Sequence, residues 1–242
     1  KFDSTNSILP NQYASGICVD NNNKVYALYF SSIGLGHLYA YTNGIWTLEQ
    51  LGIPIGNDKV EMFVDASNNI WITSEVGMVN GIIKYDGANI TTIIAGASGL
   101  PSNDINEFQI DDLGNWFYAT DDGFYSFDGV THRKFDLPNS GIPSGEIKKV
   151  VVDKYNVKWF ASYYGVTRFD GYQWHTFNVA NSSIGWEHIA DIYADNDQGL
   201  IWVTFLAGVG SSGIAYYDGI NWNTVTPAVS GGFYNGYSVT KD

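Results

Sequence analysis

The chain repeats one pattern of hydrophobic and polar positions five times. In every repeat an apolar run ends at an aspartate, a short polar turn follows, and an aromatic-rich run comes next. The leading aspartates, which we call the marker aspartates, are spaced by 45, 46, 42 and 42 residues and are Asp20, Asp65, Asp111, Asp153 and Asp195. Self-similarity at a period of this length is typical of architectures that stack one small structural unit.

Two further features keep the same period. Each repeat has a turn that ends in glycine, at Gly44, Gly87, Gly129, Gly171 and Gly219. Each also has a connector rich in Pro, Gly, Ser and Asn, with the sequences NSILPN, GIPIGN, SGLPSN, NSGIPS and NSSIG. We therefore expect one domain over 1–242, with repeats at about 12–50, 57–94, 103–135, 145–177 and 187–226 and a partial repeat at 234–242.

Each repeat predicts four short strands. In the third repeat the apolar run 105–110 fits a buried strand, and 116–120 and 124–127 follow as the second and third strands. The Asp-Gly pair at 128–129 predicts a two-residue hairpin turn with positive φ at both positions, before a last strand that ends near Phe135. Helical periodicity is absent. Four strands in roughly 40 to 45 residues predict an all-β fold, a β-propeller of four-stranded antiparallel blades with five complete repeats and a partial sixth.

The two ends of the sequence match parts of further repeats. Residues 1–3 are similar to the fourth strand of a preceding repeat, and 234–242 to the innermost strand of a following one. A closed ring must pair its first and last blades so that no edge strand is left exposed. Either the five repeats close alone with an extra terminal strand, or the chain is a piece of a longer protein with six or more blades. The second interpretation is favoured.

The fourth repeat has the most regular set of motifs. It reads NSGIPSGEIKKVVVDKYNVKWFASYYGVTRFDGYQWHTF over 139–177. It resembles the two-component-regulator-propeller repeat, in which an N-S-G-L-P-S-N connector, an apolar strand and D-x-x-G-N-x-W precede G-[LV]-x-x-[FY]-D-G-x-x-W. Repeats two, three and five match more loosely, and the first has YTNG and Tyr26 in place of YDG and Trp. The resemblance implies a sensing or binding propeller, found outside the cytoplasm in hybrid sensor kinases and in secreted multidomain proteins of Bacteroidota-type bacteria.

Charge narrows the range of partners. The chain has 25 acidic and 12 basic residues, a formal net charge of −13, and no Lys/Arg cluster. Such a protein repels phosphates, which excludes nucleic acid and anionic membrane surfaces as partners. No stretch approaches the roughly 18 apolar residues that span a bilayer, so no membrane insertion is expected, and the first residues lack the pattern of a signal peptide.

Residue usage also indicates a compartment. The lone Cys18 excludes an internal disulfide and, in an apolar strand, is expected to be an inert buried thiol. Few cysteines and lysines, abundant Asn, Gly and Ser, and an acidic surface suit an extracellular or periplasmic bacterial protein.

Most acidic and aromatic repeat positions have a structural interpretation. The marker aspartates can accept hydrogen bonds from the backbone two residues on. DNNNK and DNDQG also resemble calcium loops, but they lack a closing bidentate acid, so no cofactor is expected and calcium is the lesser alternative. One large aromatic residue stands on the second strand of every repeat, and these are expected to fill the wedges between blades as core: Tyr26, Trp71, Phe117, Trp159 and Trp202.

A candidate site emerges from positions that vary while the frame repeats. Seven residues before each marker aspartate the chain has Tyr13, Asp58, Asp104, Glu146 and His188, which are expected to ring one mouth of the propeller channel. Loops between second and third strands, and the connectors, share that face and add Phe30, Glu75, Asp121, Asp122, Tyr163, Tyr164, Trp186 and Phe205. The hypothesis is a shallow acidic and aromatic rim for a cation or a sugar. The alternative is that these residues only cap strand ends.

Catalysis has less support in the sequence. The histidines are scattered, and His132 and His175 are expected to be solvated on outer strands. His188 with Glu146 and Asp104 could form an acid/base cluster, in outline like the few propellers that are lyases or lactonases. No G-x-S-x-G, H-E-x-x-H or paired cysteine nucleophile is present.

Three function classes follow from these observations. We predict a non-catalytic binding module, with a glycan or protein partner at the rim and a place in a larger multidomain protein or assembly. A five-bladed lectin is one version of it. A propeller enzyme using Glu146 and His188, and a structural spacer or adhesin segment, are the alternatives.

Overall fold

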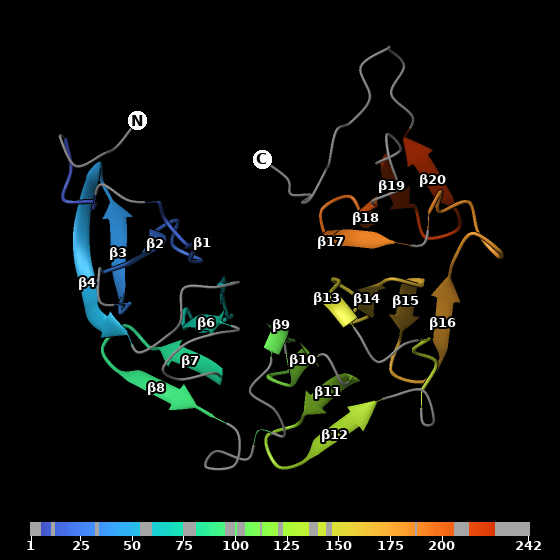
Figure 1. Cartoon of the computed structure of the whole chain (residues 1–242), viewed down its shortest axis with the longest axis horizontal. Coiled ribbons are helices and arrows are strands. Elements are labelled where there is room, and N and C mark those ends of the chain that lie inside the picture. The colour runs from blue at the N-terminus through green and yellow to red at the C-terminus, as the bar shows by residue number, and fades with distance from the viewer. Residues whose placement is uncertain are drawn as a thin grey trace. The chain divides into compact units, whose positions relative to one another are not determined.

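Every element that the structure describes is a β-strand, and the strands form five antiparallel sheets of four (Figure 1). The computed structural model describes residues 6–10, 13–31, 34–53, 60–74, 81–94, 100, 105–111, 113–120, 123–135, 140–143, 147–186, 188–205 and 213–225. Within each sheet, hydrogen-bonded neighbours follow the order of the chain. The all-β class and the four-stranded repeat are thus confirmed. We number the sheets blades 1–5 in chain order.

The chain forms two compact units, Lys1–Asn106 and Glu107–Asp242. The first unit holds blades 1 and 2, built from β1 (Gly16–Val19), β2 (Val25–Phe30), β3 (Gly36–Thr42), β4 (Ile45–Ile53), β5 (Glu61–Val64), β6 (Ile70–Ser74), β7 (Gly81–Tyr85) and β8 (Ile90–Ile93). A helix long and apolar enough to cross a membrane is not among the described elements. The predicted partial repeat at 234–242 lies outside the described residues.

The second unit holds blades 4 and 5 and nearly all of blade 3. Blade 3 has the strands β9 (Ile105–Ile110), β10 (Trp116–Thr120), β11 (Gly123–Phe127) and β12 (His132–Phe135). Blade 4 has β13 (Ile147–Val152), β14 (Lys158–Ser162), β15 (Gly165–Phe169) and β16 (Trp174–Phe177). Blade 5 has β17 (Ile189–Asp195), β18 (Leu200–Phe205), β19 (Gly213–Tyr217) and β20 (Trp222–Val225). In blade 3 the first two strands have the predicted bounds.

The hairpin between third and fourth strands differs from the prediction in blades 2 to 5. In blade 3 the last paired residues are Phe127 and His132, so the loop has the four residues 128–131. Gly129 has a φ of 92°, but Asp128 is not among the residues of positive φ. Instead, Asp128 Oδ1 accepts the backbone N–H groups two and three residues on, at 2.9 and 2.8 Å. A carboxylate that binds both groups stabilises the longer loop, and the predicted two-residue turn is wrong for this blade.

The same Asp-stabilised loop recurs. Asp86, Asp170 and Asp218 accept the equivalent N–H groups in blades 2, 4 and 5. These hydrogen bonds hold the pKa of all four carboxyls below the ordinary value. The two-residue turn is found in blade 1, where Asn43 (φ 52°) and Gly44 (φ 86°) lie between strand ends that pair directly.

The hydrophobic core of each unit lies in the seams between adjacent blades. In the seam of blades 3 and 4 the rings of Phe124 and Phe160 are 4.4 Å apart, and both are fully buried. As predicted, second-strand aromatic side chains are core in blades 1 to 4, where they are 3–7% exposed. Trp202 of blade 5 is half-buried and packs on Tyr216, with ring centroids 4.8 Å apart. Burial raises the pKa of the half-buried Cys18 thiol to about 12, in keeping with an inert thiol.

Candidate functional site

The predicted rim residues divide into described and undescribed groups. The acidic ones all lie outside the described residues: Asp58, Asp104, Asp121, Asp122 and Glu146, together with Glu75. Tyr13 is 97% exposed and belongs to the first unit. Four others, Tyr163, Tyr164, Trp186 and His188, belong to blades 4 and 5 of the second unit.

Two of the predicted rim residues are core instead. Phe30 is 9% exposed and packs in the core of blades 1 and 2. Phe205 is 6% exposed and packs in the core of blades 4 and 5. Both side chains end the second strand of their blade, and an apolar ring at this position reaches the seam rather than solvent.

The loop between β14 and β15 is a tight turn that leaves two tyrosines exposed. Ser162 Oγ accepts the N–H of Tyr164 at 3.1 Å and donates to the carbonyl oxygen of Gly165 at 3.2 Å. Gly165 has a φ of 112°, and a Cβ there would collide with the carbonyl oxygen of Phe177, so this position needs glycine. Tyr163 and Tyr164 consequently stand 40% and 54% exposed.

A basic and an imidazole side chain pack on the first of these tyrosines. Lys148 is the extra residue of a β-bulge in β13, and its Nζ lies 4.8 Å from the centroid of the Tyr163 ring. The His188 ring meets the Tyr163 ring edge-on, with centroids 3.9 Å apart. Trp186, 46% exposed, lies on the connector that enters β17 at the same edge of the sheets. We call Lys148, Tyr163, Tyr164, Trp186 and His188 the rim cluster.

The chemistry of the rim cluster is aromatic and basic. Its members present ring faces, phenolic hydroxyls, an indole and one ammonium group, and none of them is acidic. His188 Nε2 is buried and has no hydrogen-bond partner within the described ranges. A buried polar atom without a partner is costly, so a ligand hydroxyl or carbonyl that reached this atom would gain a favourable hydrogen bond.

A row of charges crosses the innermost strands of blades 3 to 5, and the sequence prediction missed it. Lys149 Nζ lies 3.0 Å from Glu107 Oε2 and 4.0 Å from Asp191 Oδ1. Glu107 is 3% exposed and Asp191 6%. Each stands four residues before a marker aspartate, and charged residues inside otherwise apolar strands were the available signal. A buried carboxylate needs a cation nearby to offset its loss of hydration, and Lys149 supplies that positive charge to both Glu107 and Asp191.

The marker aspartates close their turns as predicted. In all five blades Oδ1 accepts the N–H two residues on, at 2.8–3.2 Å. In blades 2 and 4 Oδ2 also accepts an indole N–H, from Trp71 at 2.8 Å and from Trp159 at 2.9 Å. Burial acts to raise the pKa of Asp65, but hydrogen bonds from Asn69 and Trp71 lower it overall. Among the described residues, no three His, Cys, Asp or Glu side chains converge on a possible metal position.

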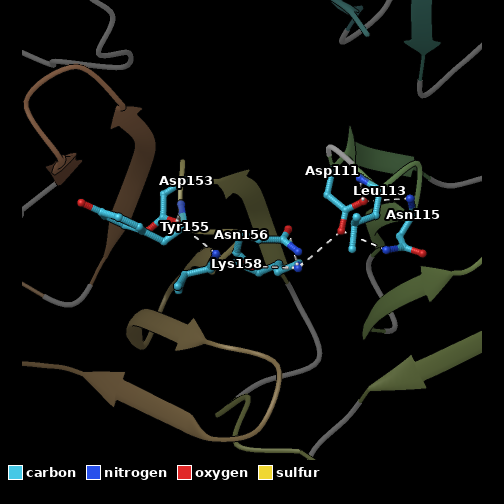
Figure 2. Close-up of polar contacts among 8 residues, drawn as sticks. Asp111, Leu113, Asn115, Asp153, Tyr155, Asn156 and Lys158 are labelled. Carbon is cyan, nitrogen blue, oxygen red and sulfur yellow. Dashed lines mark hydrogen bonds and ion pairs between the residues drawn. The ribbon is translucent and has the colours of Figure 1, made fainter. Parts of the chain in front are cut away.

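In blade 3 the residue six positions after the marker aspartate is Phe117, not tryptophan, and it has no N–H to donate. Lys158 of blade 4 approaches the carboxylate of Asp111 instead (Figure 2). Lys158 is 6% exposed, and its Nζ lies 3.6 Å from Asp111 Oδ2. The ammonium group donates to the carbonyl and side-chain oxygens of Asn156, at 2.8 and 2.9 Å, and lies 4.6 Å from the centroid of the Phe117 ring. Burial lowers the pKa of Lys158, and the nearby carboxylates of Asp111 and Asp153 oppose that shift.

One of the two histidines expected to be solvated is packed instead. His132 Nδ1 lies 2.7 Å from the hydroxyl oxygen of Tyr118, which is fully buried. The imidazole also stacks on Phe127, with centroids 4.2 Å apart. Burial lowers the pKa of His132. The expectation of solvation is wrong for His132, because a hydroxyl partner and a ring partner are both within reach, whereas His175 is exposed as predicted.

No family model matches the sequence, and no curated protein matches it. Solved structures do match. Catalytically inactive virginiamycin B lyase from Staphylococcus aureus, solved with quinupristin, is 16% identical, with a TM-score of 0.64 over 89% of this chain and 70% of that chain. The extracellular domain of the hybrid two-component system BT3049 from B. thetaiotaomicron is 16% identical, with a TM-score of 0.53 over 93% of this chain and 35% of that one.

A third similar structure is PorZ, a bacterial surface component of the type-IX secretion system of Porphyromonas gingivalis. It is 16% identical, with a TM-score of 0.60 over 81% of this chain and 31% of that chain. The chain thus spans about a third of the length of these last two proteins. The fold is a β-propeller, as predicted. The structural neighbours include both a lyase and extracellular or surface propellers.

Proposed function

We propose that this chain is a non-catalytic binding β-propeller of a secreted or periplasmic bacterial protein, related to the two-component-regulator-propeller repeat proteins. Its rim cluster binds a glycan or a protein partner. The observation that carries the proposal is the exposure of three large aromatic side chains at one edge of blades 4 and 5: Tyr163 at 40%, Tyr164 at 54% and Trp186 at 46%. Exposed aromatic groups gathered on one face are typical of binding surfaces.

The motifs of the fourth repeat support the proposed relationship and location. They resemble repeats of proteins found outside the cytoplasm, and two of the structural neighbours are an extracellular domain and a surface component. A lectin with one equivalent site per blade would repeat its contact residues. The rim positions of this chain differ from repeat to repeat, which favours one site.

The proposal is tested by thermal unfolding against a panel of oligosaccharides, each with calcium and with a chelator. A ligand at about 100 times its Kd stabilises the folded state by about 2.7 kcal/mol, which raises the Tm by about 5–10 °C. We expect one sugar class to produce this rise and Tyr163→Ala to abolish it. The matched control is Tyr172→Ala, because Tyr172 is 94% exposed on a hairpin of the same blade but lies outside the rim cluster. If no oligosaccharide of the panel raises the Tm, a glycan ligand is excluded and a protein partner remains as the proposal.

A second candidate is a lyase-like or hydrolase-like enzyme that uses Glu146 and His188. His188 Nε2 has no hydrogen-bond partner in the described part of the chain, which favours this candidate, because a catalytic imidazole needs a nitrogen that no protein group already occupies. Consumption of quinupristin, the compound present with the staphylococcal lyase, is measured by mass spectrometry. Turnover that His188→Ala and Glu146→Gln abolish without unfolding the protein would establish the enzyme. Absence of turnover supports the binding module.

A further inference from the structure

A cleft of about 530 Å³ lies between blades 4 and 5. The marker turn and hairpin of blade 4 form one side of this cleft, and β18 and β19 of blade 5 form the other. These turns are at the opposite ends of the strands from the rim cluster. We infer that this seam cleft binds a neutral oligosaccharide, independently of the rim. Its volume is in the range of pockets that hold ligands the size of a disaccharide.

The floor of the seam cleft is aromatic and rigid. Trp159 is 3% exposed and stacks on Phe177, with ring centroids 6.2 Å apart and planes 15° apart. The ring of Tyr217 lies 5.4 Å from Trp159 and 5.2 Å from Phe177. Its hydroxyl donates to the carbonyl oxygen of Gly219 at 2.9 Å, which fixes the orientation of the ring. The rings are therefore already ordered before a ligand binds, so the loss of side-chain entropy on binding is small.

The walls of the cleft supply accessible rings and an amide. Tyr155 is 73% exposed, and His175 is exposed while its ring edge contacts Phe177 at 4.4 Å. Gln173 lines the same wall. Within the described ranges, the side chains of Tyr155, Gln173 and His175 make no hydrogen bond. Their polar atoms are therefore available to a ligand without first breaking an internal hydrogen bond.

The charges that line the cleft are already compensated. Arg168 Nη1 pairs with Asp170 Oδ2 at 3.0 Å. The carboxylate of Asp153 accepts the N–H of Tyr155 at 2.9 Å and the indole N–H of Trp159 at 2.9 Å, as well as one further backbone N–H. Beside the lining, Lys154 Nζ lies 5.4 Å from the centroid of the Tyr155 ring and forms no ion pair within the described ranges, but the net charge of −13 opposes an anionic ligand. A neutral ligand fits this lining best.

A sugar matches the arrangement of these groups. One face of a pyranose ring carries C–H groups that pack on aromatic rings, and its edge carries neighbouring hydroxyls that planar guanidinium and amide groups can bind in pairs. The cleft offers both at once, with rings at the floor and Arg168 and Gln173 at the side. An aromatic peptide side chain would use the rings but leave the Gln173 amide without a partner.

The test measures intrinsic tryptophan fluorescence during titration with cellobiose, maltose, lactose and N,N′-diacetylchitobiose. Trp159 and Trp174 line the cleft and report binding there. At concentrations up to about 10 mM the titration detects a Kd of about 1 mM or tighter. We expect at least one disaccharide to bind, and Tyr155→Ala and His175→Ala each to weaken it about five- to tenfold. Tyr172 is 94% exposed on the same hairpin as Gln173 but does not line the cleft, so Tyr172→Ala leaves the affinity unchanged.

A second variant closes the cleft. The double variant Trp159→Phe, Ile201→Lys places in it the lysine side chain of the neighbouring seam and frees Asp153 Oδ2 to pair with that lysine, and it is expected to abolish binding while circular dichroism shows an intact fold. Binding by none of the four disaccharides, or binding that Tyr155→Ala and His175→Ala leave unchanged, overturns the inference. If Tyr163→Ala alone removes the binding, the sugar sits at the rim. That result overturns the inference that the seam cleft binds sugar and supports ligand binding at the rim cluster. The experiment therefore distinguishes failure of this inference from failure of the proposed function.

Discussion

The two seams on either side of blade 4 have the same strand arrangement, yet a buried lysine extends into one and a cleft lies in the other. Lys158 and Ile201 occupy equivalent positions, since each pairs across its sheet with the residue before the marker aspartate. Lys158 extends into the seam with blade 3, over Phe117. Ile201 lines the open cleft between blades 4 and 5. At this position the longer side chain thus crosses its seam to reach the neighbouring blade, whereas the shorter one lines a ligand-sized cleft.

The lysine is tolerated in its seam because a second residue differs as well. Blade 3 has Phe117 where blade 4 has Trp159, so no indole occupies Oδ2 of the blade 3 marker aspartate. That oxygen is left for the ammonium group of Lys158, at 3.6 Å. In blade 4 the equivalent oxygen already accepts the Trp159 N–H, at 2.9 Å. A buried charge requires a partner, so the two exchanges are physically linked.

The largest expected effect comes from removing the partner of the buried lysine. Asp111→Ala breaks the marker turn and leaves Lys158 unpaired at 6% exposure, which should lower the free energy of unfolding by about 3–5 kcal/mol. Asp153→Ala loses comparable hydrogen bonds but leaves Lys158 paired with Asp111. It should lower the free energy of unfolding by about 1–3 kcal/mol. Urea denaturation measures both. Equal losses would show that the ion pair does not distinguish the two seams.

An intermediate effect on the free energy of unfolding is expected when the seam of blades 4 and 5 is given the residues that the seam of blades 3 and 4 has at these two positions. Trp159→Phe removes the indole N–H that binds Asp153 and should cost about 1 kcal/mol, plus the packing of the lost ring atoms. Adding Ile201→Lys supplies an ammonium group in place of the indole. The double variant should be more stable than the sum of the single effects by about 1 kcal/mol, measured as a double-mutant cycle in urea. Trp202→Phe is the control, because Trp202 is half-buried and its indole makes no hydrogen bond in the described part of the chain. Strict additivity would contradict the linkage of the two positions.

The smallest expected effect depends on pH and concerns His132, whose position in blade 3 corresponds to Trp174 of blade 4. Burial lowers the pKa of His132, so the unfolded chain binds its proton more readily. The contribution of the neutral ring is complete above the unfolded pKa of about 6.5 and is lost as the pH falls through the lower folded value. The Tm should therefore fall modestly between pH 7.5 and 5, and the fall should be smaller in His132→Gln. An identical pH dependence in both proteins would refute this role.

The candidate site was predictable in part. Exposed Tyr163, Tyr164 and Trp186 follow from their place in connectors and loops, which lie at strand ends in any blade. The burial of Phe205 and the packing of Lys148 on Tyr163 do not, because they depend on how a neighbouring blade and a β-bulge direct each side chain. The acidic rim stays a prediction, since its residues lie outside the described part of the chain.

The sequence by itself determined the features that repeat locally. Period, strand bounds, the marker turns and the second-strand aromatic core are each encoded within one repeat, where a carboxylate and its backbone donors lie within a few residues. The tertiary structure alone decided which groups meet between blades. The pairing of Lys149 with Glu107, the reach of Lys158 to blade 3 and the open seam at Ile201 join residues about one repeat apart. Periodicity places such residues on neighbouring blades, but only the packed seam sets whether a side chain fills it, pairs across it or leaves room for a ligand.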